Sequence, residues 1–286
     1  MLARAKGMEL PAWTEEGLRR TVFKDSYTSL DEYLKGFSLT GAVMDDASSV
    51  ERIAYELASD SFTEGVRYIE VRLAPQLHIR ENFQFEQVMA AVDSGLARAR
   101  AEWNTHLEDG EPAYEYGIIV CAMRFCNAHF SPWYRSFFEM HRYSDPDEVI
   151  RLASLELVRA AVAFRDAGGA RIVGFDIAGS ERGYPASNHR EAYEYAHRNF
   201  LHKTVHAGEA YGAESIFTAI TKCHADRIGH GLLLFSETDI ADPDIVDRAK
   251  YVRDLANYIA DRPRKTRRSP ASSENTVNAA DTGRLP

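Results

Sequence analysis

The stretch YEYGIIVCAMRF, residues 114–125, is an almost unbroken apolar run that is rich in β-branched side chains. A strand that is covered on both faces has this composition, and such strands are typical of parallel sheets with helices packed outside. A strand with one face in water would alternate apolar and polar residues instead. The stretch therefore predicts a buried parallel strand, which makes an α/β fold the first hypothesis for the whole chain.

The segments on either side of this stretch alternate between strand and helix patterns. Strands are predicted near residues 66–74, 116–124, 171–177, 202–207 and 226–229. Apolar residues spaced three and four apart predict helices over 14–37, 47–65, 83–105, 146–168, 188–200, 213–224 and 243–260. Ser48 and Ser49 are the candidate caps of the second of these helices. The alternation predicts parallel strands joined by helical crossovers. A (β/α)8 TIM barrel has eight strands, so five clear strands predict an incomplete barrel of that type.

The composition excludes several classes of protein. With 286 residues, 45% hydrophobic and 27% charged, the chain fits a soluble globular protein rather than collagen, a coiled coil or a disordered polypeptide. The 34 basic and 43 acidic residues give a net charge of −9, which disfavours nucleic acid as a partner of the folded body. No apolar run is long enough for a transmembrane helix, and the N-terminus lacks the apolar region of a signal peptide. Three cysteines are too few for a disulfide scaffold, which predicts reduced thiols and a cytoplasmic location.

Polar and ionisable residues gather where the predicted strands end. In a TIM barrel, this edge of the sheet carries the chemistry. The residues concerned are Glu70, Arg72, Arg124, Asp176, His206, Glu209 and His230.

The sequence VHAGE, residues 205–209, is the strongest local signal for a site. It puts an imidazole, which suits zinc, three residues before a carboxylate that could carry protons for a metal-activated water. Gly208 lets the backbone approach a ligand closely. The competing interpretation is that His206 is a structural or solvent-facing histidine at a strand end.

Two neighbouring segments add candidates of the same kind. His230 lies between two glycines in RIGHG, residues 227–231, where its side chain is unhindered, although it could be an ordinary loop histidine. In GFDIAG, residues 174–179, Gly179 could offer its backbone N–H to a ring nitrogen of a ligand. Asp176 in the same segment could instead cap the following helix.

Taken together, GFDIAGSE, TVHAGE and DRIGHG resemble three consecutive signature segments of the adenosine deaminase family. EGVRYIEVRLAP and IIVCAMR resemble its second and third strands, so the likeness extends from about residue 14 to about residue 260. The resemblance implies a zinc-dependent (β/α)8 aminohydrolase of purine metabolism that binds a small purine nucleoside. It would convert adenosine, or a related adenine-containing compound, to the 6-oxo purine and ammonia. The other zinc deaminase design needs a Cys-x-x-Cys, which this chain lacks.

The resemblance also implies a role for each matching residue. His206 corresponds to a zinc ligand, and Glu209 corresponds to the glutamate that protonates the purine ring. His230 corresponds to the histidine that orients the attacking water, and Gly179 corresponds to the glycine whose backbone contacts the purine. Adenosine, adenine and larger adenylated compounds all remain open as substrates.

Parts of the family pattern are missing from the chain. No His-x-His of the first strand is present, and the only Asp-Asp, Asp45-Asp46, precedes the second strand and so is not the pair of the last one. Strands one, seven and eight are not found, and one matched ligand is fewer than the three that catalytic zinc usually has. We expect weak zinc binding and slow or no turnover. A gene-model fragment, a frameshift product and a truncated paralogue fit equally, and the alternative function is a non-catalytic remnant that serves as a binding or interaction module.

Two further segments have interpretations of their own. After residue 261, apolar periodicity stops, so residues 1–261 are predicted to form the partial barrel and residues 262–286 a disordered tail outside the family pattern. The RKTRR cluster in that tail is interpreted as solvated rather than as a localisation or nucleic-acid patch. The aromatic-rich stretch 125–143 could be a lid, although ordinary packing of a long connection is the favoured interpretation.

Overall fold

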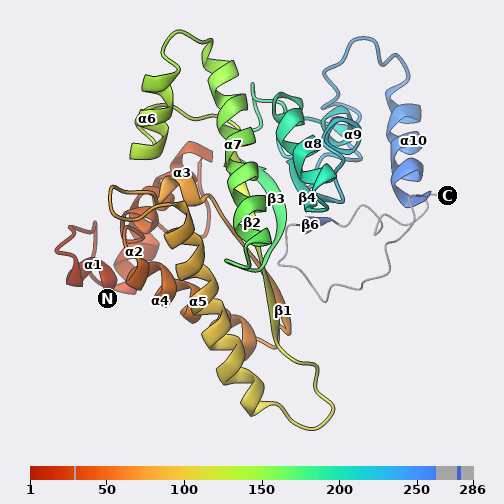
Figure 1. Cartoon of the computed structure of the whole chain (residues 1–286). Coiled ribbons are helices and arrows are strands. Elements are labelled where there is room, and N and C mark those ends of the chain that lie inside the picture. Colours follow the sequence, from red (N-terminus) through yellow and green to blue (C-terminus); the bar gives the residue numbers. More distant parts are fainter. Residues whose placement is uncertain (29, 262–275, 278–286) are drawn as a thin grey trace.

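A sheet of five parallel strands forms the centre of the molecule, in a computed structural model that describes residues 1–28, 30–261 and 276–277 (Figure 1). The strands lie side by side in chain order, as β1 (Tyr68–Leu73), β2 (Glu115–Met123), β3 (Ile172–Ala178), β4 (His202–Ala207) and β5 (Arg227–His230). Each neighbouring pair is parallel. All five predicted strands are therefore confirmed, with ends that differ by no more than two residues.

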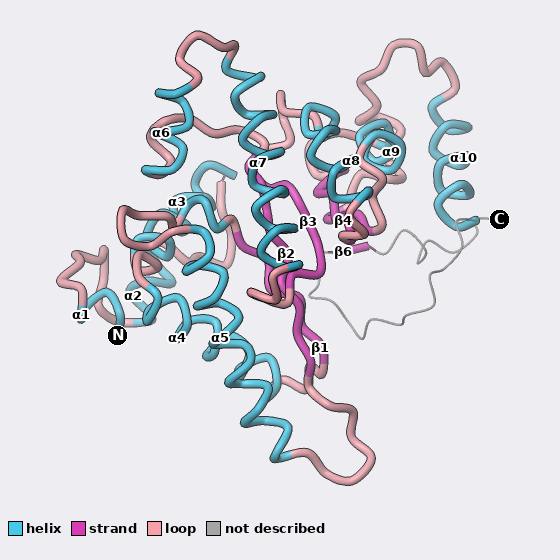
Figure 2. The backbone as a smooth tube through the Cα atoms, in the orientation of Figure 1, coloured by secondary structure: helices cyan, strands magenta, loops and turns pink. Residues whose placement is uncertain are grey.

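Helices surround the sheet and connect its strands (Figure 2). The crossovers contain α5 (Phe85–Trp103), α6 (Pro132–Met140) followed by α7 (Pro146–Asp166), α8 (Arg190–Arg198) and α9 (Ala213–Lys222). Before β1 lie α1 (Leu2–Ala5), α2 (Glu15–Thr21), α3 (Leu30–Ala42) and α4 (Ala47–Thr63), and after β5 lies α10 (Arg248–Asp261). Short 3-10 turns cover Pro75–Leu77, Asn104–His106 and Ala186–His189. Within the described part of the chain, none of these helices has the length and apolarity that crossing a bilayer requires.

The core lies between the sheet and the crossover helices. Val120, Phe175 and Val205, on three adjacent strands, are completely buried, as are Leu96 of α5 and Val158 of α7. This is why the strand of residues 114–125 lacks polar alternation, since the crossover helices and the neighbouring strands leave it almost no contact with water.

The sheet is strongly curled, as a contact between its first and fifth strands across the concave face shows. Arg227 of β5 forms an ion pair with Glu70 of β1, although three strands separate the two in the sheet. A flat sheet would hold these strands about 19 Å apart at about 4.8 Å per strand. The curvature is that of a partial barrel, whose strand ends all face one mouth.

The end of the chain differs in part from expectation. Residues 262–275 and 278–286 of the predicted disordered tail lie outside the described residues. Thr276–Val277 form β6, which pairs antiparallel with β5 through Ile228 and Gly229. The edge of β5 offers backbone hydrogen-bonding groups to any extended segment, and apolar periodicity cannot reveal such pairing.

Two local expectations are settled by side-chain contacts. The cap of α4 is Asp46, whose carboxylate accepts a hydrogen bond from the Ser49 amide at 2.8 Å, so the candidates Ser48 and Ser49 were wrong. All three residues are good caps, and only Asp46 has the extended backbone that precedes a helix. In the stretch 125–143, α6 buries Tyr134 against Ile150 and Ala153 of α7, which supports packing rather than a lid.

Candidate functional site

The structure brings three of the four predicted site residues together at the carboxyl ends of β4 and β5. The rings of His206 and His230 meet edge to face, with 5.0 Å between their centres. The Glu209 carboxylate oxygen Oε2 lies 3.8 Å from Nε2 of His230. Because β4 and β5 are adjacent and pair Ala207 with His230, their ends deliver all three side chains to one place.

A sharp change of chain direction at Gly208 makes this convergence possible. Gly208 has a positive φ of 75°, and a Cβ built there would lie 2.7 Å from Cδ1 of Ile216 and 3.3 Å from the Cα of Gly231. A side chain would therefore be both strained and obstructed at this position. His230 itself has a φ of 65°, a conformation that is uncommon outside glycine and often marks functional sites.

His206 is held by a buried carboxylate on the next strand. Its Nδ1 lies 3.1 Å from Oδ1 of Asp176 on β3, and the other oxygen of Asp176 accepts a hydrogen bond from Arg72 of β1 at 2.7 Å. Asp176 is completely buried, and Oδ1 also accepts from the amide of Ile177. Asp176 therefore orients the imidazole instead of capping the following helix.

The charge state of Asp176 determines which ring nitrogen of His206 holds the proton and which has a free lone pair. Burial opposes ionisation of Asp176, but His206 and Arg72 outweigh it and hold the pKa of the carboxyl below its usual value. An ionised Asp176 accepts a hydrogen bond from Nδ1–H of His206, so in the neutral ring Nε2 carries the lone pair. This is the usual arrangement of a metal-ligating histidine with a carboxylate behind it.

The environment of His230 favours the neutral imidazole. Burial lowers its pKa, the Glu209 carboxylate opposes that effect, and His206 adds to it. The net direction is downward. A neutral ring can accept a hydrogen bond from a water molecule at one nitrogen, which a protonated ring cannot do.

Gly179 ends up at the same edge of the sheet, directly after β3. It has a φ of 102°, and a Cβ built there would lie 3.6 Å from Met123 and 3.9 Å from Arg124, both at the end of β2. The structure thus places Gly179 among strand ends, beside β2 rather than within the group of Glu209 and the two histidines.

Sequence reasoning missed Glu181, which lies in the same GFDIAGSE segment as Gly179. Its side chain is only 3% exposed, and its carboxylate accepts hydrogen bonds from the backbone of the turn that contains Glu209. The sequence does contain a signal for Glu181, because an acidic residue within a motif that is predicted to be buried needs hydrogen-bond donors around its carboxylate. Which partners it finds depends on the turn after the next strand.

The described residues do not form a complete zinc site by themselves. Within residues 1–28, 30–261 and 276–277, no group of three or more His, Cys, Asp or Glu side chains could hold a metal ion. At the strand ends, His206 has a carboxylate behind its ring, since Nδ1 lies 3.1 Å from Oδ1 of Asp176. One imidazole does not meet the three ligands that catalytic zinc usually has.

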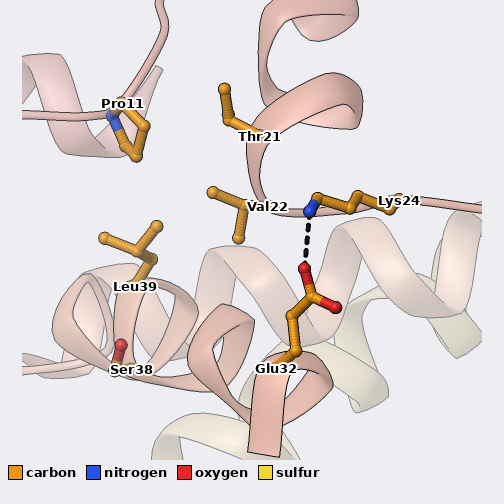
Figure 3. A pocket seen from close by; sticks show the side chains of 7 residues that line it. All are labelled: Pro11, Thr21, Val22, Lys24, Glu32, Ser38 and Leu39. Carbon is orange, nitrogen blue, oxygen red and sulfur yellow. Dashed lines mark hydrogen bonds and ion pairs between the residues drawn. The ribbon is translucent and has the colours of Figure 1, made fainter. Parts of the chain in front are cut away.

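A cavity of about 340 Å³ lies elsewhere, among the N-terminal helices. Figure 3 shows Val22 and Leu39 on its apolar side and the 2.6 Å ion pair between Lys24 and Glu32 on its polar side. The seven residues that line it all come from the first 39 residues of the chain. The cavity is therefore separate in sequence from His206, Glu209 and His230, which we call the strand-end group.

Comparison with known proteins supports the same fold and family. The family model described as adenosine deaminase matches residues 1–282. The adenosine deaminase of Mycobacterium leprae is 38% identical over 239 residues, which are 82% of this chain and 56% of that protein. The chain therefore spans little more than half the length of this curated relative.

Two solved structures resemble this one. The first is the adenine deaminase of Arthrobacter aurescens, with a TM-score of 0.62 and 22% identity, and the likeness covers 89% of this chain and 70% of that one. The second is an amidohydrolase of Burkholderia ambifaria described with bound zinc, with a TM-score of 0.61 and 19% identity, and the likeness covers 91% of this chain and 57% of that one. At these identities the likeness shows the fold alone. The incomplete TIM-barrel prediction is confirmed.

Proposed function

Because this chain belongs to the adenosine deaminase family, whose model matches residues 1–282, we propose that its strand-end group serves hydrolytic deamination of an adenine-containing compound. Water would add to the amino-bearing ring carbon, the carbon–nitrogen bond would break, and the products would be the 6-oxo purine and ammonia. The observation that supports this most is the meeting of Glu209, His206 and His230 at the ends of β4 and β5. The curated relative carries the name of an enzyme, which gives no support to the alternative of a non-catalytic module.

This chemistry needs one side chain that donates a proton and one that accepts a proton, and the strand-end group contains both. Attack on an aromatic ring carbon is easier when the adjacent ring nitrogen is protonated, and we assign that donation to the carboxyl of Glu209. The attacking water has to be oriented and relieved of a proton, which suits the neutral imidazole of His230 beside it. Gly179 would contribute its backbone N–H to the purine from the end of β3.

Zinc remains a proposed cofactor. His206 would supply one ligand through Nε2, and bound zinc would supply an acidified water. The support is the Asp176 carboxylate behind Nδ1 and the zinc described for the Burkholderia amidohydrolase of the same fold. Since the described residues do not complete a zinc site, further ligands would have to come from outside them.

We propose adenosine as the first substrate to test, because the family model and the curated relative carry that name. Adenine is the second, since the solved structure from Arthrobacter is called an adenine deaminase. Both are small purines, which suits the acidic net charge better than a nucleic-acid polymer does. A cytoplasmic location is proposed as well, supported by cysteines that are all free and buried.

The experiment is an ammonia-release assay of the full chain with added zinc, using adenosine and adenine separately. We expect slow release that falls about a hundredfold or more in Glu209→Gln, because the general acid is lost. Glu214→Gln is the matched control, since Glu214 binds the amide of Ala241 rather than facing His230. Release that is absent, or that is equal in Glu209→Gln and the wild type, would overturn the proposal for this chain.

A further inference from the structure

A single buried carboxylate binds the backbone of the turn that carries Glu209. Oε2 of Glu181 accepts hydrogen bonds from three consecutive amides, those of Glu209 at 3.0 Å, Ala210 at 2.7 Å and Tyr211 at 3.3 Å. Oε1 accepts from the amide of Gly208 at 3.1 Å and from the hydroxyl of Ser215 in α9. Four consecutive N–H groups thus point at one side chain. Backbone N–H groups in this arrangement can bind an anion, and here the anion is the carboxylate of Glu181.

The surroundings keep this carboxylate charged. Burial opposes ionisation of Glu181, but the hydrogen bonds from Ser215 and Ala210 and the positive charge of Arg124 outweigh it and lower its pKa. An ionised carboxylate accepts stronger hydrogen bonds than a neutral acid or an amide does. The bonds to the turn are therefore of the strong kind, although the side chain is only 3% exposed.

Two further contacts connect the same pair of segments. The amide of Gly183 donates to the hydroxyl oxygen of Tyr211 at 3.0 Å, so the connection also runs in the opposite direction. Arg124, at the end of β2 and only 2% exposed, donates to the carbonyls of His206 and Tyr184. Arg124 thus holds the segment 206–211 through the carbonyl of its first residue, and Glu181 holds it through the amides of residues 208–211.

We propose that Glu181 is a positioning residue, whose carboxylate fixes the backbone of residues 208–211 and thereby keeps the Glu209 side chain beside His230. The amide of Glu209 is itself one of the four donors, so the constraint acts directly on the residue concerned. Within the described residues, Glu181 forms no hydrogen bond or ion pair with His230 and acts on that ring only through its charge, so its hold on Glu209 is exerted through the backbone of the turn. The importance assigned to Glu209 rests on the proposed function, whereas the constraint on the turn does not.

The test is hydrogen exchange of backbone amides in the full chain, compared between the wild type, Glu181→Gln and Glu214→Gln. The glutamine keeps the size of the side chain but turns an NH2 group toward donors and removes the charge. We expect exchange at residues 208–211 to accelerate at least about tenfold in Glu181→Gln, as for the loss of hydrogen bonds to a charged group. Amides of β2 and β3 should be unchanged. Glu214→Gln, which affects one amide at Ala241, should leave residues 208–211 unchanged.

A second variant keeps the test decisive if Glu181→Gln does not fold. Ser215→Ala removes one hydrogen bond to the carboxylate and leaves the other four, so it should accelerate the same amides by a smaller factor. Unchanged exchange at 208–211 in the variant that folds, or equal acceleration over the whole sheet, would overturn the proposal.

Activity provides the readout that a purely structural role would not change. Where the wild type releases ammonia, Glu181→Gln should lower kcat about tenfold or more and change KM less than about threefold, because misplacement of Glu209 affects the transition state more than substrate binding. Equal changes in KM and kcat would count against positioning. If the wild type releases no ammonia, the proposed function fails, and the exchange experiment still decides whether Glu181 holds the turn.

Discussion

The carboxyl ends of β3–β5 and the N-terminal helices α1–α3 are organised in opposite ways. At the strand ends, Asp176 and Glu181 are almost fully buried and each has several partners. In the N-terminal region, α2 buries none of its residues, and Trp13 and Phe37 are about half exposed, at 47% and 57%. Figure 1 shows these helices at the side of the molecule, away from β4 and β5.

This contrast predicts which parts of the molecule contribute most to the free energy of unfolding. Polar groups in the sheet region are held by partners on other strands, so they become ordered only when the sheet forms. Elements with few buried contacts tend to open at lower free energy than the core. We therefore expect substitutions in the sheet region to change global unfolding, and those in the N-terminal helices to have local effects.

The largest contrast should come from two phenylalanines. Phe175 of β3 is completely buried and packs edge to face on Tyr193, with ring centres 5.2 Å apart. Phe175→Ala should lower the free energy of unfolding by about 3–5 kcal/mol through lost burial and the cavity that remains. Phe37→Ala on α3 should change it by less than about 0.5 kcal/mol. Denaturant unfolding measures both, and equal effects would remove the contrast.

The second largest effect should be a loss of stability at low pH that originates in the buried region around the sheet. Burial, with the positive charge of Arg124, lowers the pKa of His189 to about 4. The unfolded state takes up a proton near pH 6.5. Stability should therefore fall as the pH drops from about 6.5 to about 4, by up to about 3 kcal/mol from this residue, and then level off. In His189→Gln, unfolding curves across this range should show a weaker decline, and a decline as steep as in the wild type would contradict the assignment.

The buried carboxylate at the site should give a smaller effect. Asp176→Asn keeps the shape but removes the charge between Arg72 and His206. Because Arg72 is 30% exposed in its side chain, water compensates part of the loss, and we expect about 2 kcal/mol of destabilisation. The surface pair Arg67–Glu111 is the control, and Glu111→Gln should destabilise the protein much less than Asp176→Asn does, because water and salt screen an exposed pair. Thermal or denaturant unfolding that ranks the two variants in reverse would argue against a buried network.

The smallest effect should be confined to α2. The hydroxyl of Thr14 accepts a hydrogen bond from the amide of Gly17 at 3.1 Å and caps this helix. Thr14→Ala should cost about 1 kcal/mol of helix stability. Amide exchange should accelerate in Glu15–Thr21, while the midpoint of global unfolding stays within error. A shift of that midpoint would show that the N-terminal helices unfold together with the sheet.

Much of the fold was predictable, because the signals for it are local. Alternation and apolar runs depend on neighbours two to four residues away, and they predicted β1–β5 to within two residues. The helix α6 was missed because the aromatic residues of 125–143 do not show which face will be buried until α7 lies beside them. The strand β6 was missed because backbone pairing with β5 needs no side-chain pattern.

Some residues of the site were likewise predictable from local patterns, whereas others depend on partners that are distant in the chain. Motif spacing was enough to select His206, Glu209 and His230, since residues that follow the ends of adjacent parallel strands lie at the same edge of a sheet. Asp176 was left with a second interpretation as a helix cap, because its true partners are 30 and 104 positions away in the chain. Glu181 was missed for the same reason, with partners 27 to 34 positions away.

Local patterns along the chain were enough to predict the order and direction of the strands and the residues at their ends. Which of those residues are in contact depends on how the strands and turns are arranged in space. The curvature of the sheet brings Glu70 to Arg227 across three intervening strands, and the turn after β4 wraps its amides around Glu181. The physical reason is that hydrogen bonds and ion pairs act over a few ångströms in space, whereas sequence patterns register only neighbours along the chain.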